Sequence, residues 1–327
     1  MINSQIKLLA EASQKLIKEV ARVSTFDPDA LECLAAIVDE GGFERAARRL
    51  SITQSAVSQR LRALEAQVGT VLIVRSRPLK ATSAGQLLLK HTKMLRLLRA
   101  DLERDLKELA PSSLRGAREE ERISIAINAD SIATWALQAL TGLAQQGLPM
   151  EIITDDQDFT HEWLRQGQVL GCVTTLKQAL RGCKVVALGA MEYVAVATPA
   201  LARERLGTQG LTAHNFREIP FVAFNRKDDL QADFVGRACG LRRVTLSQRF
   251  VPSSEGQVRA VQAGWGASVV PEMLVRELLQ RGDLVNLAPQ ITLPVSLYWH
   301  CWNLDSEVID RLTNALEAAA QQALHTK

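Results

Sequence analysis

The sequence predicts a small α+β headpiece with a long linker helix, followed by a larger α/β body that is big enough for two lobes. Three observations predict this fold class. Helical patterns fill roughly the first third of the chain and are broken by one short β-hairpin. A leucine repeat follows the hairpin. Beyond a charged stretch, short apolar strands alternate with helices, which is typical of α/β structure with parallel strands.

The headpiece begins with three helices in quick succession. They are predicted over residues 29–40, 43–50 and 54–68. Gly41-Gly42 ends the first and Gly69 ends the third, because glycine readily takes the left-handed conformation that stops a helix. Residues 71–74 form a short β-run and residues 75–78 a turn, so a small hairpin follows the third helix.

A long helix is predicted next, from an N-cap at Thr82 to about residue 109. Four leucines fall seven residues apart and Leu98 lies between them: Leu88, Leu95, Leu102 and Leu109. This repeat predicts pairing with another helix in a coiled coil. His91 and Asp105 interrupt the seam, so packing against its own domain is an alternative. The polar stretch 111–121 is predicted to be a hinge.

The body is predicted to contain eight strands, at residues 123–127, 151–154, 171–174, 193–197, 221–224, 246–251, 267–270 and 297–299. Helices are predicted at residues 131–145, 159–166, 230–238, 255–263 and 271–280. Thr198-Pro199 is the predicted crossover between two lobes. The domain boundaries that follow are 1–25 for an N-terminal extension of unknown role, 26–85 for the headpiece, 86–121 for linker helix and hinge, and 122–327 for the body. Lobe I comprises about 122–198 and 299–327, and lobe II about 199–298.

Charge is unevenly distributed along the chain. The whole chain carries +3. Residues 42–80 hold eight basic and two acidic residues, a balance of +6, so the remainder sums to −3. A basic headpiece on a mildly acidic body is typical of a DNA-binding module joined to a sensor. A solvated basic face explains the charge alone equally well.

Cysteine usage and the N-terminus point to a cytoplasmic protein. The five cysteines are scattered, with no C-x-x-C pair and no His/Cys cluster, which predicts reduced thiols, no metal site and no cofactor. No apolar run approaches the roughly 18 residues of a membrane span. Charges interrupt residues 1–23, so no signal peptide is predicted. An amphipathic helix and a disordered arm both fit residues 1–25.

Residues 43–65 carry the pattern of a helix-turn-helix. Ala47 is the small residue needed where two helices cross, and Ile52 is an apolar plug for the turn. Val57, Leu61 and Leu64 form an inward face at i, i+4 and i+7. The outward face is polar, as major-groove reading requires, and the hairpin is basic, which suits contact with phosphates. The candidate DNA contacts are Thr53, Gln54, Ser55, Ser58, Gln59, Arg60, Arg62, Arg75, Arg77 and Lys80.

Two strand ends predict a ligand pocket in the body. One is Asn128-Ala129-Asp130-Ser131 and the other is residues 251–255. Ligands of open α/β sheets bind at carboxyl strand ends, where helix N-termini suit a carboxylate and acidic side chains suit a cation. Ordinary helix capping explains each acid or serine taken singly. The candidate effector contacts are Asn128, Asp130, Ser131, Trp135, Asp156, Ser253, Ser254 and Glu255.

The segment 43–89 resembles the headpiece of LysR-type transcriptional regulators. The matching elements are residues 43–47, 53–58 and 61–65, and Arg75, Pro78, Thr82 and Gly85. The resemblance continues through the body. It implies a winged headpiece, a dimerising linker helix, and a two-lobed effector domain like type II periplasmic binding proteins. It also implies homodimers or homotetramers on operator DNA, with RNA polymerase as a candidate partner.

Three further segments are similar to the branch of that family that includes ArgP and LysG: residues 128–135, 253–255 and 297–300. The similarity implies lysine or arginine as effector and control of basic amino-acid export or metabolism. Cys172 departs from the small residue, such as alanine, that is usual there, and we interpret it as a packing change. His300, bracketed by Trp299 and Trp302, is predicted to be structural.

Three alternatives compete with this interpretation. A LysR-type regulator could respond to a different small molecule. A solute-binding protein could use the same two-lobed body, but a basic headpiece and the lack of an export signal disfavour it. An enzyme is disfavoured because the sequence has no G-x-S-x-G, H-E-x-x-H, P-loop or dinucleotide fingerprint.

Overall fold

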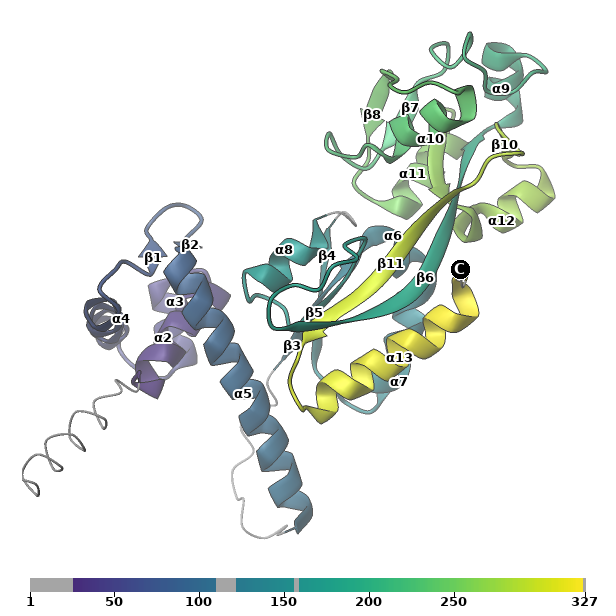
Figure 1. Ribbon diagram of the computed structural model, residues 1–327. Coiled ribbons are helices and arrows are strands. Elements are labelled where there is room, and N and C mark those ends of the chain that lie inside the picture. The colour runs from purple at the N-terminus through teal and green to yellow at the C-terminus, as the bar shows by residue number, and fades with distance from the viewer. Residues whose placement is uncertain (1–25, 110–121, 156–158, 326–327) are drawn as a thin grey trace, which may run out of the picture. The chain divides into compact units, whose positions relative to one another are not determined.

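The computed structural model describes residues 26–109, 122–155 and 159–325 (Figure 1). The chain divides into two compact units, residues 1–96 and 97–327. The N-terminal extension, the predicted hinge at 111–121 and the candidate site residue Asp156 lie outside the described residues.

The first unit is a three-helix headpiece with a hairpin. Its elements are α2 (Pro28–Asp39), α3 (Phe43–Arg49), α4 (Gln54–Val68), β1 (Ile73–Val74), β2 (Lys80–Ala81) and the first part of α5 (Ser83–Leu109). β1 and β2 pair antiparallel. The helix predictions are confirmed to within a residue or so. The predicted strand 71–74 is shorter, because pairing begins only at Ile73.

Local chemistry sets the ends of these helices. The Thr53 side chain accepts a hydrogen bond from the backbone N–H of Ala56 (3.1 Å) and so caps α4. Gly69 ends α4 with φ at +81°. Thr82 accepts from the N–H of Gly85 at 3.1 Å, which confirms the predicted cap. A Cβ on Gly85 would lie 2.2 Å from the carbonyl oxygen of Leu72, so only glycine lets α5 pack this closely on the hairpin.

The second unit contains a mixed sheet in the order β10-β6-β11-β5-β3-β4, with β9 also paired to β6. Its first lobe is built from β3 (Ile123–Asn128), α6 (Ala129–Ser131), a π-helical turn (Ile132–Ala136), α7 (Leu137–Gln145), β4 (Met150–Asp155), α8 (Thr160–Arg165), β5 (Gly171–Thr174) and α13 (Glu307–Ala323). β3 pairs parallel with both β4 and β5. The carboxyl ends of β3 and β4 therefore lie side by side.

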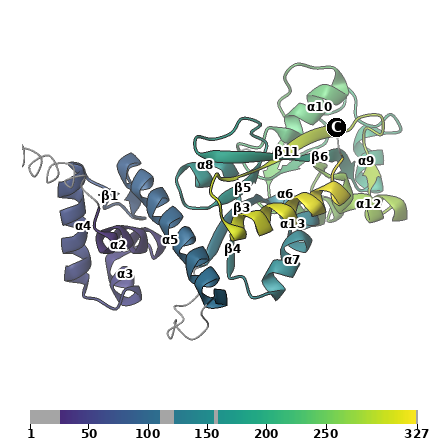
Figure 2. The ribbon, with the colours of Figure 1, turned by 60° about the horizontal axis from the view of Figure 1, so that its bottom comes forward.

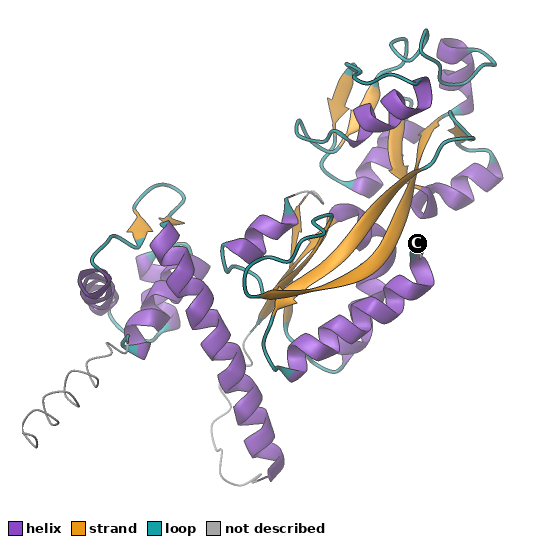
Figure 3. Ribbon diagram, viewed as in Figure 1, coloured by secondary structure: helices purple, strands orange, loops and turns teal. Residues whose placement is uncertain are grey.

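Two long strands, β6 (Cys183–Ala197) and β11 (Leu293–Trp302), run together from the first lobe into the second (Figures 1 and 2). The second lobe holds α9 (Pro199–Leu206), β7 (Phe221–Ala223), α10 (Leu230–Cys239), β8 (Gln248–Phe250), α11 (Ser254–Gln262), β9 (Ser268–Pro271), α12 (Glu272–Arg281) and β10 (Val285–Asn286). Figure 3 shows the strands of this unit flanked by helices.

The body departs from the sequence predictions in three ways. The predicted strands 193–197 and 297–299 are only parts of β6 and β11, and both long strands pair antiparallel. Among the described residues, the expectation of parallel strands holds for β3 with β4 and β5, for β7 with β8, and for one bridge between Phe221 and Ala267. The predicted crossover at Thr198-Pro199 follows the end of β6 and begins the helix α9, which was not predicted and which Thr198 caps. α13 and β10 were not predicted. Within the described residues, no helix has both the length and the apolar character needed to cross a membrane.

Candidate DNA-binding surface and ligand cleft

The helix-turn-helix pattern is built as the sequence predicts. Ala47, which was assigned to the helix crossing, is buried, and Val57, Leu61 and Leu64 of α4 are at most 2% exposed in the headpiece core. Ile52 packs against the same core from the turn. This packing leaves one face of α4 for solvent.

That outward face carries the polar side chains. Gln54, Ser55, Gln59 and Arg62 are exposed. The amide nitrogen of Gln54 donates to the hydroxyl of Ser58 at 3.1 Å, which orders the first turn of the helix. Thr53, by contrast, has its hydroxyl engaged in capping α4. Amide and guanidinium groups on an exposed helix face are the groups that read base edges in the major groove.

Two of the predicted basic contacts make contacts within the headpiece. Arg60 forms an ion pair with Asp29 of α2 at 3.1 Å, so its guanidinium is held on the α2 side of α4. The Arg75 guanidinium lies 5.2 Å from the centre of the Phe43 ring and links the hairpin to α3. Arg77 and Lys80 are exposed on the hairpin. Thr53, Arg60 and Arg75 thus each have a partner within the headpiece, although Thr53 and Arg75 are also exposed.

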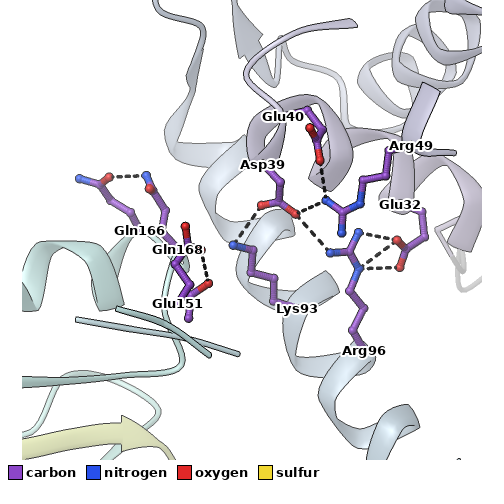
Figure 4. A network of polar contacts seen from close by, with 10 residues as sticks. Glu32, Asp39, Glu40, Arg49, Lys93, Arg96, Glu151, Gln166 and Gln168 are labelled. Atoms are coloured by element: carbon purple, nitrogen blue, oxygen red, sulfur yellow. Dashed lines mark hydrogen bonds and ion pairs between the residues drawn. The ribbon is translucent and has the colours of Figure 1, made fainter. Parts of the chain in front are cut away.

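An ion-pair network that the sequence analysis missed joins α5 to α2 (Figure 4). Arg96, whose side chain is 10% exposed, donates from Nε to both carboxylate oxygens of Glu32 at 2.9 Å. Asp39 accepts from Arg96 at 3.3 Å and pairs with Lys93 and Arg49 at 3.2 Å each. Burial would raise the pKa of Asp39, but Lys93, Arg96 and Arg49 outweigh it and lower the pKa. The network fixes the start of the linker helix to the headpiece.

In the second unit, the ends of β3 and β7 meet at a small cavity of about 30 Å³. It lies between the lobes and is lined by Asn128, Ala129, Asp130, Phe224, Asp228, Leu230, Gln231, Gln257 and Val269. Two of these side chains are carboxyl groups. Among the described residues that line the cavity, none is Lys, Arg or His. The cavity is therefore suited to a cation.

Asn128 and Asp130 are brought together there, as the sequence predicts. Asn128 is 1% exposed, and neither atom of its side-chain amide has a hydrogen-bond partner among the described residues. Its side chain does not cap α6, so ordinary capping does not explain it. The carboxylate of Asp130 accepts from the Tyr193 hydroxyl at 2.6 Å. Burial raises the pKa of Asp130, the hydroxyls of Ser254 and Tyr193 oppose the rise, and Asp228 adds to it.

Asp228 is the cavity residue that sequence reasoning missed. Its carboxylate accepts from the backbone N–H groups of Phe224 and Leu230, both at 2.9 Å. Burial is the largest cause of its raised pKa. A weaker signal for it was present, since Asp228 lies in the segment between the strand β7 and the helix α10.

The two glutamines of the cavity are engaged in holding the second lobe together. Gln231 accepts from the N–H of Val269 at 2.7 Å and donates to its carbonyl at 3.0 Å. The Gln257 carbonyl accepts from the Ser268 hydroxyl at 3.1 Å. These pairs leave Asn128, Asp130 and Asp228 as the polar side chains that can face a ligand.

The other candidate effector residues lie off the cavity lining. Ser131 and Trp135 are buried, and neither the Ser131 hydroxyl nor the Trp135 indole N–H has a partner among the described residues. Ser253 caps α11 by accepting from Gly256 at 3.0 Å, and Glu255 is exposed in the first turn. Ser254 is buried, and its hydroxyl lowers the pKa of Asp130 but has no hydrogen bond of normal geometry among the described residues. His300 is buried with its Nε2 2.6 Å from the Leu176 carbonyl, as a structural histidine would be.

A second, larger cavity of about 630 Å³ lies at the end of β4. Its lining includes Asp155 and Trp163 from the first lobe and Arg226 and Lys227 from the second. Asp155 is the strand partner of Asn128 across the β3–β4 pair. The two cavities therefore open at neighbouring strand ends, one acidic and one with charges of both signs.

Comparison with known proteins agrees with both units. Residues 28–86 match the bacterial regulatory helix-turn-helix proteins of the lysR family, and residues 116–321 match the LysR substrate binding domain. The chain is 41% identical over 294 residues to the HTH-type transcriptional regulator LysG of Mycobacterium tuberculosis, covering 90% of this chain and 93% of the relative. It is 39% identical over 300 residues to the regulator ArgP of Pseudomonas fluorescens, covering 91% and 98%.

Two solved structures are similar over the same length. The crystal structure of ArgP from Mycobacterium tuberculosis is 39% identical, covers 93% of this chain and 100% of that chain, and has a TM-score of 0.79. Full-length LysG from Corynebacterium glutamicum with bound effector Arg is 36% identical, covers 91% and 99%, and has a TM-score of 0.68.

A helix-turn-helix headpiece joined to a two-lobed body with an inter-lobe cleft defines a transcriptional regulator with a ligand-binding domain. The chain belongs to the LysR family of bacterial transcriptional regulators. Its relatives are regulators and not enzymes.

Proposed function

We propose that this regulator responds to a basic amino acid, lysine or arginine, bound between the two lobes of its body, and controls basic amino-acid export or metabolism. The observation that carries the proposal is the cavity at the ends of β3 and β7, where two carboxyl groups and an unpartnered Asn128 amide meet without a basic side chain among the described lining residues. A buried ammonium or guanidinium needs such partners. The related LysG with bound Arg supports the same ligand class.

DNA contact is assigned to the exposed face of α4 and to the hairpin. The proposed contacts with base edges or phosphates are Gln54, Ser55, Ser58, Gln59, Arg62, Arg77 and Lys80. Thr53, Arg60 and Arg75 support this surface through a cap, an ion pair and a ring contact. The same proposal includes the domain boundaries given above, a dimer or tetramer on the operator, and a cytoplasmic location.

The effector acts by changing the relation between the lobes. β6 and β11 connect the lobes, and the cavity lies where the lobes face each other. A ligand can shift the lobes only if it binds one arrangement more tightly than another. A cation between Asp130 and Asp228 does so, because it bridges one carboxyl from each lobe.

Calorimetric titration of the full-length protein with each of the twenty amino acids tests this function. We expect heat from lysine, arginine or both. Asp130→Asn should abolish the thermal stabilisation that arginine gives, because it removes one anionic partner of the cation. Asp233→Asn, an exposed position on α10, is the matched control and should retain the shift. Binding of a neutral amino acid in place of both basic ones would contradict the proposed effector.

A further inference from the structure

The cavity between the lobes brings together two carboxyl groups without a countercharge. Asp130 comes from α6 of the first lobe and Asp228 from the segment between β7 and α10 of the second. Both line a space of about 30 Å³, and none of the described lining residues is basic. Two carboxylates in one partly buried site repel each other, and reduced contact with solvent disfavours the charged form of each. A shared proton, or a cation between the two carboxyls, relieves this repulsion.

We propose that Asp130 and Asp228 hold one proton between them when the cleft is free, and that the cationic group of the effector replaces this proton on binding. The inference rests on the proposed function for the identity of the cation. It adds a regulatory property: effector binding releases a proton, so the response depends on pH as well as on effector concentration.

The groups that surround Asp130 and Asp228 support a shared proton, because they are neutral. Asp130 faces the Tyr193 hydroxyl of β6 and the Ser254 hydroxyl of α11, both of which are neutral. Asp228 faces the backbone N–H groups of Phe224 and Leu230.

The other described residues that line the cavity carry no positive charge. α10 contributes the side chain of Gln231 to Asp228, α11 adds Gln257, and β9 contributes Val269. Asp229, the next residue along the chain, raises the pKa of Asp228 further.

The two basic residues that directly precede Asp228 in the chain, Arg226 and Lys227, line the second cavity together with Asp155 of β4. The Lys227 ammonium lies 4.7 Å from the centre of the Phe159 ring, and the Arg226 guanidinium lies over Phe250. Both basic groups are thus engaged with aromatic rings. Burial is the main cause that raises the pKa of each carboxyl, and the repulsion from Asp228 adds to the rise at Asp130.

Charge balance explains why the exchange is favourable. The free pair, with one proton, carries a charge of −1. When an ammonium or guanidinium enters, the O–H bond of the carboxylic acid breaks and the proton leaves to solvent. Two carboxylates and one cation again sum to −1. The buried charge is unchanged, so the effector need not bring a new net charge into a site with little water.

The sign of the pH effect follows from linkage. Below the pH at which the pair loses its proton, the effector must displace that proton, so its affinity falls by up to about tenfold per pH unit. Above that pH the carboxyls are already ionised and affinity becomes independent of pH. Acidification therefore weakens the response to effector.

Infrared difference spectroscopy of the free, full-length protein tests the pair without any ligand. Wild type minus the Asp130→Asn/Asp228→Asn double variant should show a protonated-carboxyl C=O band near neutral pH, which shifts on labelling with ¹³C-aspartate. Asp233→Asn, an exposed position on α10 that does not line the cavity, should keep the band. Absence of the band from wild type, at every pH where the protein is folded, overturns the inference whatever arginine does.

Titration with L-arginine then tests the exchange, with neutral L-citrulline as the matched control ligand. Arginine should remove the band, and calorimetry in buffers of different ionisation enthalpy should report about one proton released per site. Citrulline should leave the band in place. If arginine binds while the band stays intact and no proton is released, the proposed exchange is wrong, but the shared proton in the free protein still stands. A band in a protein that binds neither arginine nor lysine contradicts the proposed effector.

Discussion

At the scale of single residues, the end of a strand is the signal that identifies cavity residues in the sequence. This signal identified Asp130 but not Asp228. Asp130 was predicted because it follows an apolar strand and precedes a helix. Asp228 also lies between a strand and a helix, but five residues after β7. It is part of the run Asn225-Arg226-Lys227-Asp228-Asp229, whose mixed charges resemble a solvated turn. Only the fold shows that Asp228, and not its neighbour Asp229, turns inward.

The same distinction between inward and outward side chains leads to a prediction for DNA binding. Arg62→Ala and Gln54→Ala should each weaken operator binding by about 1–3 kcal/mol, because removing a side chain that bonds a base edge costs that much. Fluorescence anisotropy with labelled promoter fragments measures the change. Gln67→Ala, also exposed on α4, is the control. Arg60→Ala should have a smaller effect, since its guanidinium is paired with Asp29. Equal affinity for wild type and both test variants would refute the assignment of this helix face.

At the scale of elements, helices were predicted far better than long strands. The headpiece helices are marked in the sequence by glycine stops and by the i, i+4, i+7 spacing of Val57, Leu61 and Leu64. β6 and β11 are hard to recognise in the sequence, because Gly189, with φ at +128°, lies within β6 and Pro294 lies within β11. Glycine and proline are unfavourable inside strands, and these strands form through pairing with segments that are distant in sequence.

The ion-pair network of α2 and α5 predicts how the headpiece responds to substitution and to pH. Asp39→Asn should lower the stability of this unit by about 2 kcal/mol at neutral pH, since Lys93, Arg96 and Arg49 lose a charged partner. Amide hydrogen exchange of α2 and α5 in the full-length protein measures it. Asp29→Asn, in an exposed pair, is the control and should cost under about 1 kcal/mol.

The pH dependence of that effect has a definite sign. The pKa of Asp39 is lowered from 3.8 in the folded state. Its contribution is therefore fully present above that value and is lost as pH falls further, through the folded-state pKa. Wild type and Asp39→Asn should converge in stability as the pH drops below about 4. A stability difference that stays constant down to the acid-unfolded range would show that packing, and not charge, is responsible.

The leucines of the repeat in α5 differ in exposure along the helix. Leu88 is 8% exposed and packs in the headpiece core, whereas Leu95, Leu98 and Leu102 are 47%, 40% and 56% exposed. Packing on its own domain is confirmed for Leu88, and the coiled-coil seam remains a prediction for the exposed leucines. An exposed leucine row of this kind is what a second helix would cover.

Sedimentation velocity tests the seam. Leu98→Lys should shift the protein toward a smaller oligomer, because a charge at an inward coiled-coil position must be buried or the seam must open. Ala100→Lys adds the same charge outside the leucine row and should leave the oligomer unchanged. If Leu98→Lys and wild type sediment identically, the leucine row does not hold the oligomer together.

At the scale of the whole molecule, charge is partitioned along the chain. Residues 42–80 carry +6 while the rest sums to −3. Part of this positive charge is neutralised within the headpiece, because Arg49 and Arg60 form ion pairs with acidic residues there. The exposed remainder, which includes Arg62, Arg77 and Lys80, is what can neutralise phosphates. Because the rest of the chain adds no net positive charge, nonspecific attraction to DNA is concentrated in residues 42–80.

This partition predicts the salt dependence of operator binding. Each phosphate neutralised should contribute a slope of about −0.9 to a plot of log affinity against log salt concentration. Arg77→Ala on the hairpin should make the slope shallower by about 1 for each phosphate left without its cation, while preserving the order of preference among operator sequences. Arg62→Ala should instead relax sequence preference. The two variants should differ in this way if α4 contacts bases and the hairpin contacts the phosphate backbone. Identical salt slopes and sequence preferences in both variants would contradict these assignments.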